Sequence, residues 1–153
     1  MSFISFSTAI ELTERSERTL WRLISDGSVS RELANGKAMV DLVSLRPYLC
    51  LPINDEDDDL AMIHEADQGD AAAQTDLALL LLANGKQKGA IYWLELATKQ
   101  DYPDAMNWLG RCYIEGNGVT KDVNTGLIWI AKAAAQGHVI SKAQLDGMHG
   151  SFS

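Results

Sequence analysis

Cysteines, a cationic start and long apolar runs are all scarce or missing in this chain of 153 residues. Its two cysteines, Cys50 and Cys112, cannot form a disulfide framework or a metal cage on their own. The longest apolar run, residues 77–83, has seven residues, whereas a membrane-spanning helix needs about twenty. The first basic residue is Arg15, so no cationic stretch precedes an apolar one as it does in a signal peptide. We therefore expect a soluble protein of the cytoplasm, and neither secretion nor membrane insertion.

The sequence also lacks the residue spacings that are typical of metal sites and of enzyme active sites. The three histidines, His64, His138 and His149, are scattered and lack metal-ligand spacing. The stretch Gly116-Asn-Gly118 lacks the preceding strand and the Lys-Ser/Thr pair of a phosphate-binding loop. No acid–base pair and no activated nucleophile stands out. We therefore expect no catalytic residues, no metal, no cofactor and no small-molecule substrate, and the sequence does not predict an enzyme.

The chain is rich in acidic residues, and these residues are unevenly distributed along it. Its 13 Lys and Arg are outnumbered by 21 Asp and Glu, which gives a formal net charge of −8 at pH 7. Residues 1–50 hold six residues of each sign, whereas residues 51–153 hold seven basic and fifteen acidic ones. A run of five consecutive acids over 55–59 repels itself and stays solvated. We predict a first domain over 1–53, an acidic linker over 54–59 and a second domain over 60–150.

Two short helices separated by a tight turn are predicted at the start of the first domain. Thr8 can cap a helix over residues 8–12, because Glu11 follows three residues later. Ser16 is a suitable N-cap for a second helix over residues 17–25.

The Asn35-Gly36 pair predicts a β-hairpin, because both residues tolerate the positive φ angles of a two-residue hairpin turn. A final short helix is expected around residues 44–48. Folding about the turn would place a set of apolar residues on one face, where they would close a small core: Val29, Leu33, Ala38, Val40 and Leu42.

Residues 7–27 resemble the winged helix-turn-helix of excisionase-type and MerR-type DNA-binding domains. The shared pattern is a helix with small residues, a turn ending in Ser, an Arg-Thr-x-aromatic-Arg stretch, an apolar pair and a Gly before the wing. The resemblance implies a second helix in the major groove and a hairpin wing on the phosphate backbone. Arginine can bind guanine edges bidentately, and hydroxyls and cations suit phosphates. The implied DNA contacts are Ser16, Glu17, Arg18, Thr19 and Arg22 in the groove, Trp21 near a phosphate or in the core, and Arg31 and Lys37 on the wing.

The second domain repeats itself, with units offset by 32 residues in their first helices and 36 in their second. The difference falls in the loop between the two helices of a unit. The matching pairs are Ala73 with Ala105, Leu77 with Leu109, Trp93 with Trp129 and Ala97 with Ala133. The predicted helix pairs are 71–83 with 88–99 and 104–115 with 123–136, flanked by single helices around 60–69 and 137–145.

The stretch 104–122 resembles the Sel1-like repeat, a relative of the tetratricopeptide repeat. It carries that family's Ala, Leu-Gly, Tyr, Gly-x-Gly-Val loop and Asp. The resemblance implies stacked helix pairs with a concave face that holds a peptide or a partner protein. Small residues such as Gly110 would let the helices approach closely, and the acidic excess favours a basic partner surface. The aromatic residues expected to fill the space between helices are Trp93, Trp108, Tyr113 and Trp129.

Together these patterns predict a mainly α protein: a small winged helix-turn-helix with one β-hairpin, followed by a short α/α solenoid of Sel1-like helix pairs. The expected function is that of a bacterial transcription regulator. Its helix-turn-helix would read double-stranded DNA, and its repeats would bind a partner protein or a second copy. Residues 1–50 are neutral and offer few cations for phosphates, so DNA binding would need a dimer or a partner. The alternative is a non-enzymatic adaptor or anti-regulator whose helix-turn-helix docks on protein and does not bind DNA.

Overall fold

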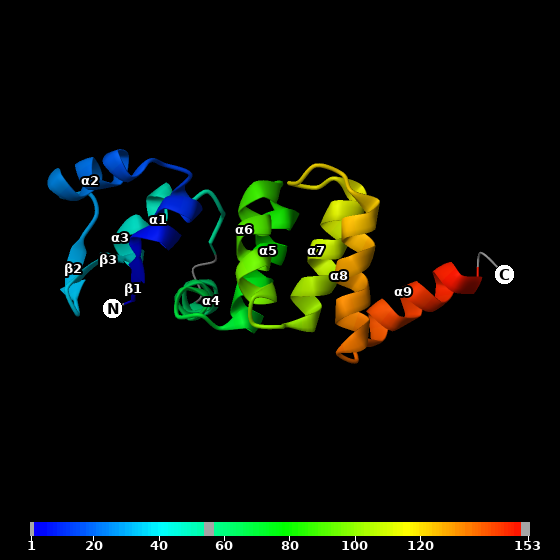
Figure 1. Ribbon diagram of the computed structural model, residues 1–153. Coiled ribbons are helices and arrows are strands. Elements are labelled where there is room, and N and C mark those ends of the chain that lie inside the picture. Colours follow the sequence, from blue (N-terminus) through cyan, green and yellow to red (C-terminus); the bar gives the residue numbers. More distant parts are fainter. Residues whose placement is uncertain (1, 54–56, 151–153) are drawn as a thin grey trace. The chain divides into compact units, whose positions relative to one another are not determined.

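The computed structural model describes residues 2–53 and 57–150 and divides into two compact units, residues 1–68 and 69–153 (Figure 1). Of the predicted acidic linker over 54–59, residues 54–56 lie outside the described residues. The rest of that segment begins a helix, α4 (Asp57–Asp67), which belongs to the first unit. The described chain therefore passes from one unit to the other at Gln68 and Gly69.

The N-terminal unit combines short helices with a small sheet, in the predicted order of helix, turn, helix, hairpin and helix. A strand that the sequence pattern did not predict, β1, precedes the first helix. The elements before α4 are β1 (Phe3–Ser5), α1 (Phe6–Thr13), α2 (Glu17–Ser25), β2 (Arg31–Ala34), β3 (Lys37–Asp41), α3 (Leu42–Leu45) and the 3-10 turn η1 (Arg46–Tyr48).

The three strands form an antiparallel sheet in the order β1-β3-β2. Ile4 lies opposite Val40 in one pair of strands, and Arg31 lies opposite Val40 in the other. Asn35 and Gly36 form the hairpin turn with φ angles of 52° and 79°. Positive φ at both central residues is what a type I′ turn requires, so the predicted hairpin is observed.

The predicted core face of the hairpin is only partly correct. Val29, Val40 and Leu42 are buried as expected, but Leu33 is 66% exposed. All four residues of β2 are exposed, whereas Ile4 on the other edge strand, β1, is fully buried. The strand β2 therefore lies outside the small core.

A carboxylate from α4 holds the start of α1. Ser5, and not Thr8 as predicted, is the N-cap of α1 and accepts a hydrogen bond from the Thr8 backbone N–H. Asp67 in turn accepts hydrogen bonds from the Ser5 N–H (3.1 Å), the Ser5 Oγ (2.6 Å) and the Thr8 Oγ1 (2.6 Å). Residues 60–67 were expected to begin the repeat domain. Asp67 instead connects this helix to the N-terminal unit.

Helix pairs make up the second unit, close to the predicted ranges, and stand side by side in Figure 1. Small shifts occur only at helix ends, and the last helix follows the second pair as expected. The helices are α5 (Ala71–Ala83), α6 (Gln87–Thr98), α7 (Pro103–Glu115), α8 (Val123–Ala135) and α9 (Val139–Gly150).

Two glycines let α7 and α8 touch backbone to backbone. A Cβ atom on Gly110 would lie 2.7 Å from the Gly126 carbonyl oxygen and 2.8 Å from Ile130 Cγ1. A Cβ atom on Gly126 would lie 2.5 Å from the Gly110 carbonyl oxygen. Neither position has room for a side chain, which confirms the predicted role of Gly110 in close helix approach.

The aromatic residues of the repeats do not all fill the core. Trp93 is fully buried, but Trp108, Tyr113 and Trp129 are only half-buried, contrary to the prediction. No helix among the described residues is long and apolar enough to cross a membrane.

The glycine contact predicts the effect of one methyl group. Gly110→Ala should destabilise the chain by about 1–3 kcal/mol, because the new Cβ forces α7 and α8 apart. Gly89→Ala is the matched control: its Cβ would lie 3.6 Å from Leu81, an ordinary contact, so the better helix former should stabilise by up to about 1 kcal/mol. Urea unfolding of the full chain, followed by far-UV circular dichroism, measures both. Equal effects of the two substitutions would contradict the packing argument.

A second prediction concerns Asp67. Asp67→Ala should destabilise the N-terminal unit by about 1–3 kcal/mol, because three donors lose their acceptor. Amide hydrogen exchange should then accelerate in residues 5–13. Glu65→Ala removes an exposed carboxylate from the same helix and should change stability by less than about 0.5 kcal/mol. Unchanged exchange in Asp67→Ala would mean that α4 does not hold α1.

Candidate nucleic-acid interface and repeat surface

Helix α2 separates an apolar side from a polar side. Leu20 and Leu23 are buried, whereas Arg18, Trp21 and Arg22 are exposed. With 3.6 residues per turn, positions 18, 21, 22 and 25 share the side opposite Leu20 and Leu23. The two α2 arginines among the predicted DNA contacts, Arg18 and Arg22, are therefore exposed on one face of the helix.

The start of α2 holds the predicted hydroxyl residues. Ser16 is the N-cap as predicted: its Oγ accepts a hydrogen bond from the Thr19 backbone N–H at 3.2 Å. The hydroxyls of Ser16 and Thr19 lie 3.0 Å apart and hydrogen-bond to each other. Glu17 is exposed in the first turn, where its charge suits the helix dipole. These contacts order the helix start, and a further partner would compete with them.

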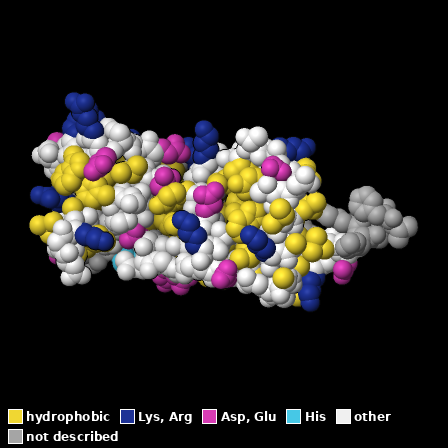
Figure 2. Space-filling view, viewed as in Figure 1, with side chains coloured by type: hydrophobic (Ala, Val, Ile, Leu, Met, Phe, Trp, Pro, Cys, Tyr) yellow, Lys and Arg dark blue, Asp and Glu magenta, His cyan; other side chains and the backbone are white. Residues whose placement is uncertain are grey.

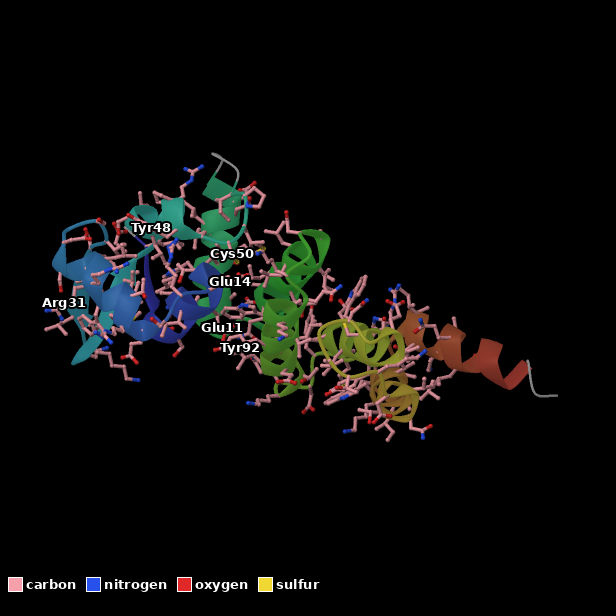
Figure 3. The ribbon with its side chains drawn as sticks, turned by 90° about the horizontal axis from the view of Figure 1, so that it is seen from above. Glu11, Glu14, Arg31, Tyr48, Cys50 and Tyr92 are labelled. Carbon is pink, nitrogen blue, oxygen red and sulfur yellow. The ribbon has the colours of Figure 1, made fainter. Side chains whose placement is uncertain are left out.

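A stack of three side chains connects α1, α2 and the hairpin. The rings of Phe6 and Trp21 lie 4.8 Å apart between centroids and are inclined by 28°. The Arg31 guanidinium lies over the same indole, 5.3 Å from its centroid. Trp21 is 37% exposed, so it is neither a core residue nor a free one. Figure 3 shows Arg31 on the hairpin, and the sequence patterns did not predict its contact with Trp21.

The other predicted wing residue stands apart from this stack. Lys37 is exposed and follows the Asn35-Gly36 turn. A cation absent from the prediction lies in the turn between α1 and α2, where the Arg15 guanidinium lies 5.1 Å from the Tyr48 ring centroid. The sequence shows Arg15 in the predicted turn between the two helices, but no sequence pattern indicates that Arg15 contacts Tyr48.

Electrostatically, the N-terminal unit is strongly acidic once α4 is included. Residues 1–68 contain six basic and thirteen acidic residues. Hydrogen bonds from Ser28 lower the pKa of Asp26, so the C-cap of α2 stays charged at neutral pH. Figure 2 shows cationic and acidic side chains interspersed on the visible face of this unit. The basic residues of this unit thus lie among acidic ones and do not form a surface of net positive charge.

In the repeat unit, half-buried tryptophans carry cations on their faces. The Arg111 guanidinium lies 4.5 Å from the Trp108 ring centroid, and the Lys132 ammonium lies 4.5 Å from that of Trp129. Each indole is thus partly packed against the helices and partly exposed at the surface, where a cation lies over it.

A groove of about 510 Å³ opens beside Trp129, between the end of α6 and the end of α8. Its lining residues are Thr98, Lys99, Asp101, Met106, Trp129, Lys132, Ala135 and Gln136. A smaller groove of about 340 Å³ shares Gln136 with it and includes Asp104 and His138.

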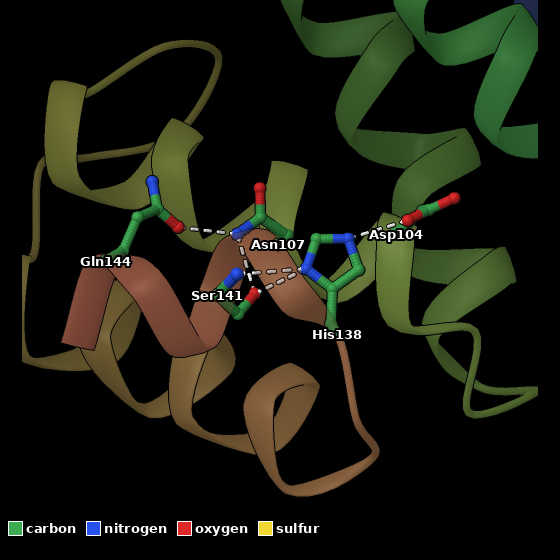
Figure 4. A network of polar contacts seen from close by, with 5 residues as sticks. All are labelled: Asp104, Asn107, His138, Ser141 and Gln144. Carbon is green, nitrogen blue, oxygen red and sulfur yellow. Dashed lines mark hydrogen bonds and ion pairs between the residues drawn. The ribbon is translucent and has the colours of Figure 1, made fainter. Parts of the chain in front are cut away.

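A polar network joins α7 to the start of α9 (Figure 4). His138 Nδ1 accepts the Ser141 backbone N–H at 3.1 Å, which leaves His138 Nε2 to donate to Asp104 Oδ1 at 2.7 Å. The Asn107 amide donates to the Ser141 Oγ and to Gln144 Oε1, each at 2.7 Å. The network thereby caps α9 and fixes it on α7.

The same network contains a Ser, a His and an Asp in contact, which sequence inspection did not find. Ser141 is fully buried, and its Oγ already accepts the Asn107 amide. A nucleophile must reach a substrate carbonyl, so this set acts in helix capping rather than in acyl transfer. Burial raises the pKa of the Cys112 thiol, which also keeps it unreactive. Among the described residues, no group of three or more His, Cys, Asp or Glu could hold a metal ion.

Comparisons with known proteins concern the repeat unit. The Sel1 repeat family model matches residues 71–102 and 103–138. A Sel1 repeat protein from Oxalobacter formigenes is similar, with 25% identity and a TM-score of 0.52 over 57% of this chain and 37% of that one. The second is c5321, a protective antigen of uropathogenic Escherichia coli strains with an SLR fold; it has 31% identity and a TM-score of 0.55 over 61% of this chain and 21% of that one. No curated protein matches the chain.

The chain therefore spans well under half the length of either solved relative. The family match begins at the first residue of α5 and covers both helix pairs through α8. Sequence, helix pairing and solved relatives agree, and they identify residues 71–138 as two consecutive Sel1-like repeats.

Proposed function

We propose that this protein is a DNA-binding transcription regulator of the bacterial cytoplasm. Its N-terminal unit would act as a winged helix-turn-helix, and its Sel1-like repeats would bind a partner protein or a second copy. The observation that carries the DNA-binding part is the exposed face of α2, where Arg18 and Arg22 lie one turn apart beside a hairpin whose Arg31 is held over Trp21.

Each predicted contact has a chemical role in this proposal. Arg18 and Arg22 would reach base edges or phosphates in the major groove. Arg31 and Lys37, on the exposed hairpin, would contact the phosphate backbone. Ser16, Glu17 and Thr19 would order the helix start, and Trp21 would hold Arg31 in place.

The repeats supply what the N-terminal unit lacks. Four exposed cations in one copy release few counterions, so one copy would bind DNA weakly. Helix-pair repeats form surfaces for protein partners. A second copy or a partner held there would join two DNA-contacting units, and the linked units would bind far more tightly than one.

The alternative is an adaptor whose helix-turn-helix docks on protein. Leu33 is 66% exposed and Trp21 is 37% exposed, and both are residue types that protein interfaces bury. Six basic and thirteen acidic residues in residues 1–68 also oppose approach to DNA.

DNA retention at low salt distinguishes the two functions. Genomic duplexes retained by the full chain would be sequenced, and the affinity for an enriched duplex measured by fluorescence anisotropy at several salt concentrations. Arg18→Ala with Arg22→Ala should abolish motif enrichment. It should also make the slope of log K against log salt less negative by about 2, because two cations are lost.

The matched control removes two exposed cations from the repeats instead: Lys88→Ala with Lys121→Ala. It changes the net charge equally and should leave the slope and the motif unchanged. Equal loss in both variants would mean that only total charge matters, and no retention by the wild type would favour the adaptor.

The stack predicts energetic coupling between Trp21 and Arg31. Once Trp21→Leu has removed the indole, Arg31→Ala should cost less DNA affinity than it does in the wild type. We expect a coupling energy of about 0.5–1 kcal/mol, the usual strength of an exposed cation–π contact. A double-mutant cycle on the enriched duplex measures it, and strictly additive losses would show that Trp21 does not position Arg31.

A further inference from the structure

The groove beside Trp129 has two lysines on its rim, of which Lys132 lies over the Trp129 indole. Lys99 is the C-cap of α6, and Lys132 lies in the last turn of α8. Neither ammonium forms an ion pair within the part of the chain that the structure describes. Both side chains are exposed, so a ligand in the groove can reach them.

The two lysines are not required to complete the helix ends. The Thr98 carbonyl accepts the Asp101 N–H at 3.0 Å, and the Ala133 carbonyl accepts the Gln136 N–H at 3.1 Å. The last turns are therefore closed by backbone groups. Lysines near helix C-termini do gain a little from the dipole, but this gain leaves their hydrogen-bonding capacity open.

Apart from its charged residues, the groove has a mainly apolar lining. Trp129 is half-buried with one face under Lys132, and Met106 and Thr98 are buried beneath the surface. A wall of this kind favours an apolar side chain, whereas the ammonium groups favour a carboxylate. Asp101 is the one carboxylate among the residues that line this groove in the described chain, so the local balance of the lining is positive.

The adjoining groove restricts the direction of a bound segment. It begins at Gln136 and carries Asp104, whose carboxylate is 56% exposed. Asp104 and the nearby Asp76 and Asp70 also raise the pKa of Tyr102, after the larger effect of burial. An acidic residue is thus attracted at the Lys99–Lys132 end and repelled at the other.

We propose that this groove binds an extended segment of a partner protein in which an acidic side chain adjoins an apolar one. The acidic side chain would pair with Lys99 and Lys132, and the apolar one would lie against Trp129. This inference rests on the proposed partner-binding role of the repeats and names the chemistry of that partner. It also differs from the basic partner that the net charge of −8 favours, because the local charge of the groove is opposite to that of the chain.

Peptide selection on the full chain tests the proposal. A display library of random dodecapeptides would be selected on the wild type, and the enriched peptides measured by fluorescence anisotropy. We expect an acidic residue next to an apolar one, and an affinity about tenfold lower for Lys99→Ala with Lys132→Ala, as two exposed ion pairs are lost. Replacing the acidic residue of the peptide by its amide should weaken wild-type binding but not binding to the double variant.

Lys88→Ala with Lys121→Ala is the control of equal charge and should bind the peptides like the wild type. Enrichment of no sequence, enrichment of basic peptides, or equal binding by the lysine variants would overturn the proposal. Lys99→Ala with Lys132→Ala could instead make the slope of log K against log salt for DNA binding less negative. The two lysines would then contact phosphates, and the proposal would also be overturned. DNA retention is measured separately through Arg18 and Arg22, so its failure would leave a lysine-dependent peptide site standing.

Discussion

The repeat unit depends on the contact between two glycines. At Gly110 and Gly126 the backbones of α7 and α8 approach so closely that no Cβ fits at either residue. Ile130 lies at this contact, with its Cγ1 2.8 Å from the position of a Cβ on Gly110, and Ile130 is fully buried. Larger side chains then have no place inside the pair, and the half-buried indole of Trp129 lies at its edge, beside the groove. Close packing of small residues thus determines which aromatic surface the repeats can offer a ligand.

In the N-terminal unit the corresponding constraint is electrostatic. Asp67 satisfies three donors at the start of α1, and this contact makes α4 part of the unit. The acids that precede Asp67 come with it, so residues 1–68 hold six basic and thirteen acidic residues. At physiological salt, charges separated by more than about 8 Å are largely screened. Net acidity therefore acts on a nucleic acid mainly at close range, and under the proposed function the arginines on α2 would have to supply the local attraction.

Patterns of local origin were predictable, and contacts between distant segments were not. The helix pairs followed from repeated small and aromatic residues, the hairpin from Asn35-Gly36, and the second helix from its Ser16 cap. The strand β1 was not predicted, because an alternating pattern cannot be recognised over only three residues. Leu33 was misplaced because alternation assigns a face but does not tell how far the covering helices extend. The stack of Arg31 on Trp21 joins two different elements, and the hydrogen bonds of Asp67 reach a residue 62 positions away, so no pattern within one element encodes either contact.

The division of charge between the units bears on which partners each could accept. The repeat unit holds seven basic and eight acidic residues, so it neither attracts nor repels a charged segment as a whole. Recognition there must come from local arrangement, such as the two ammonium groups beside an indole in the groove. The N-terminal unit is different, because its net charge opposes nucleic acid and only a few well-placed cations favour it. Under the proposed function a second copy would double those cations, and the nearly neutral repeat unit, with a net charge of −1, would hold the two copies together with little electrostatic repulsion.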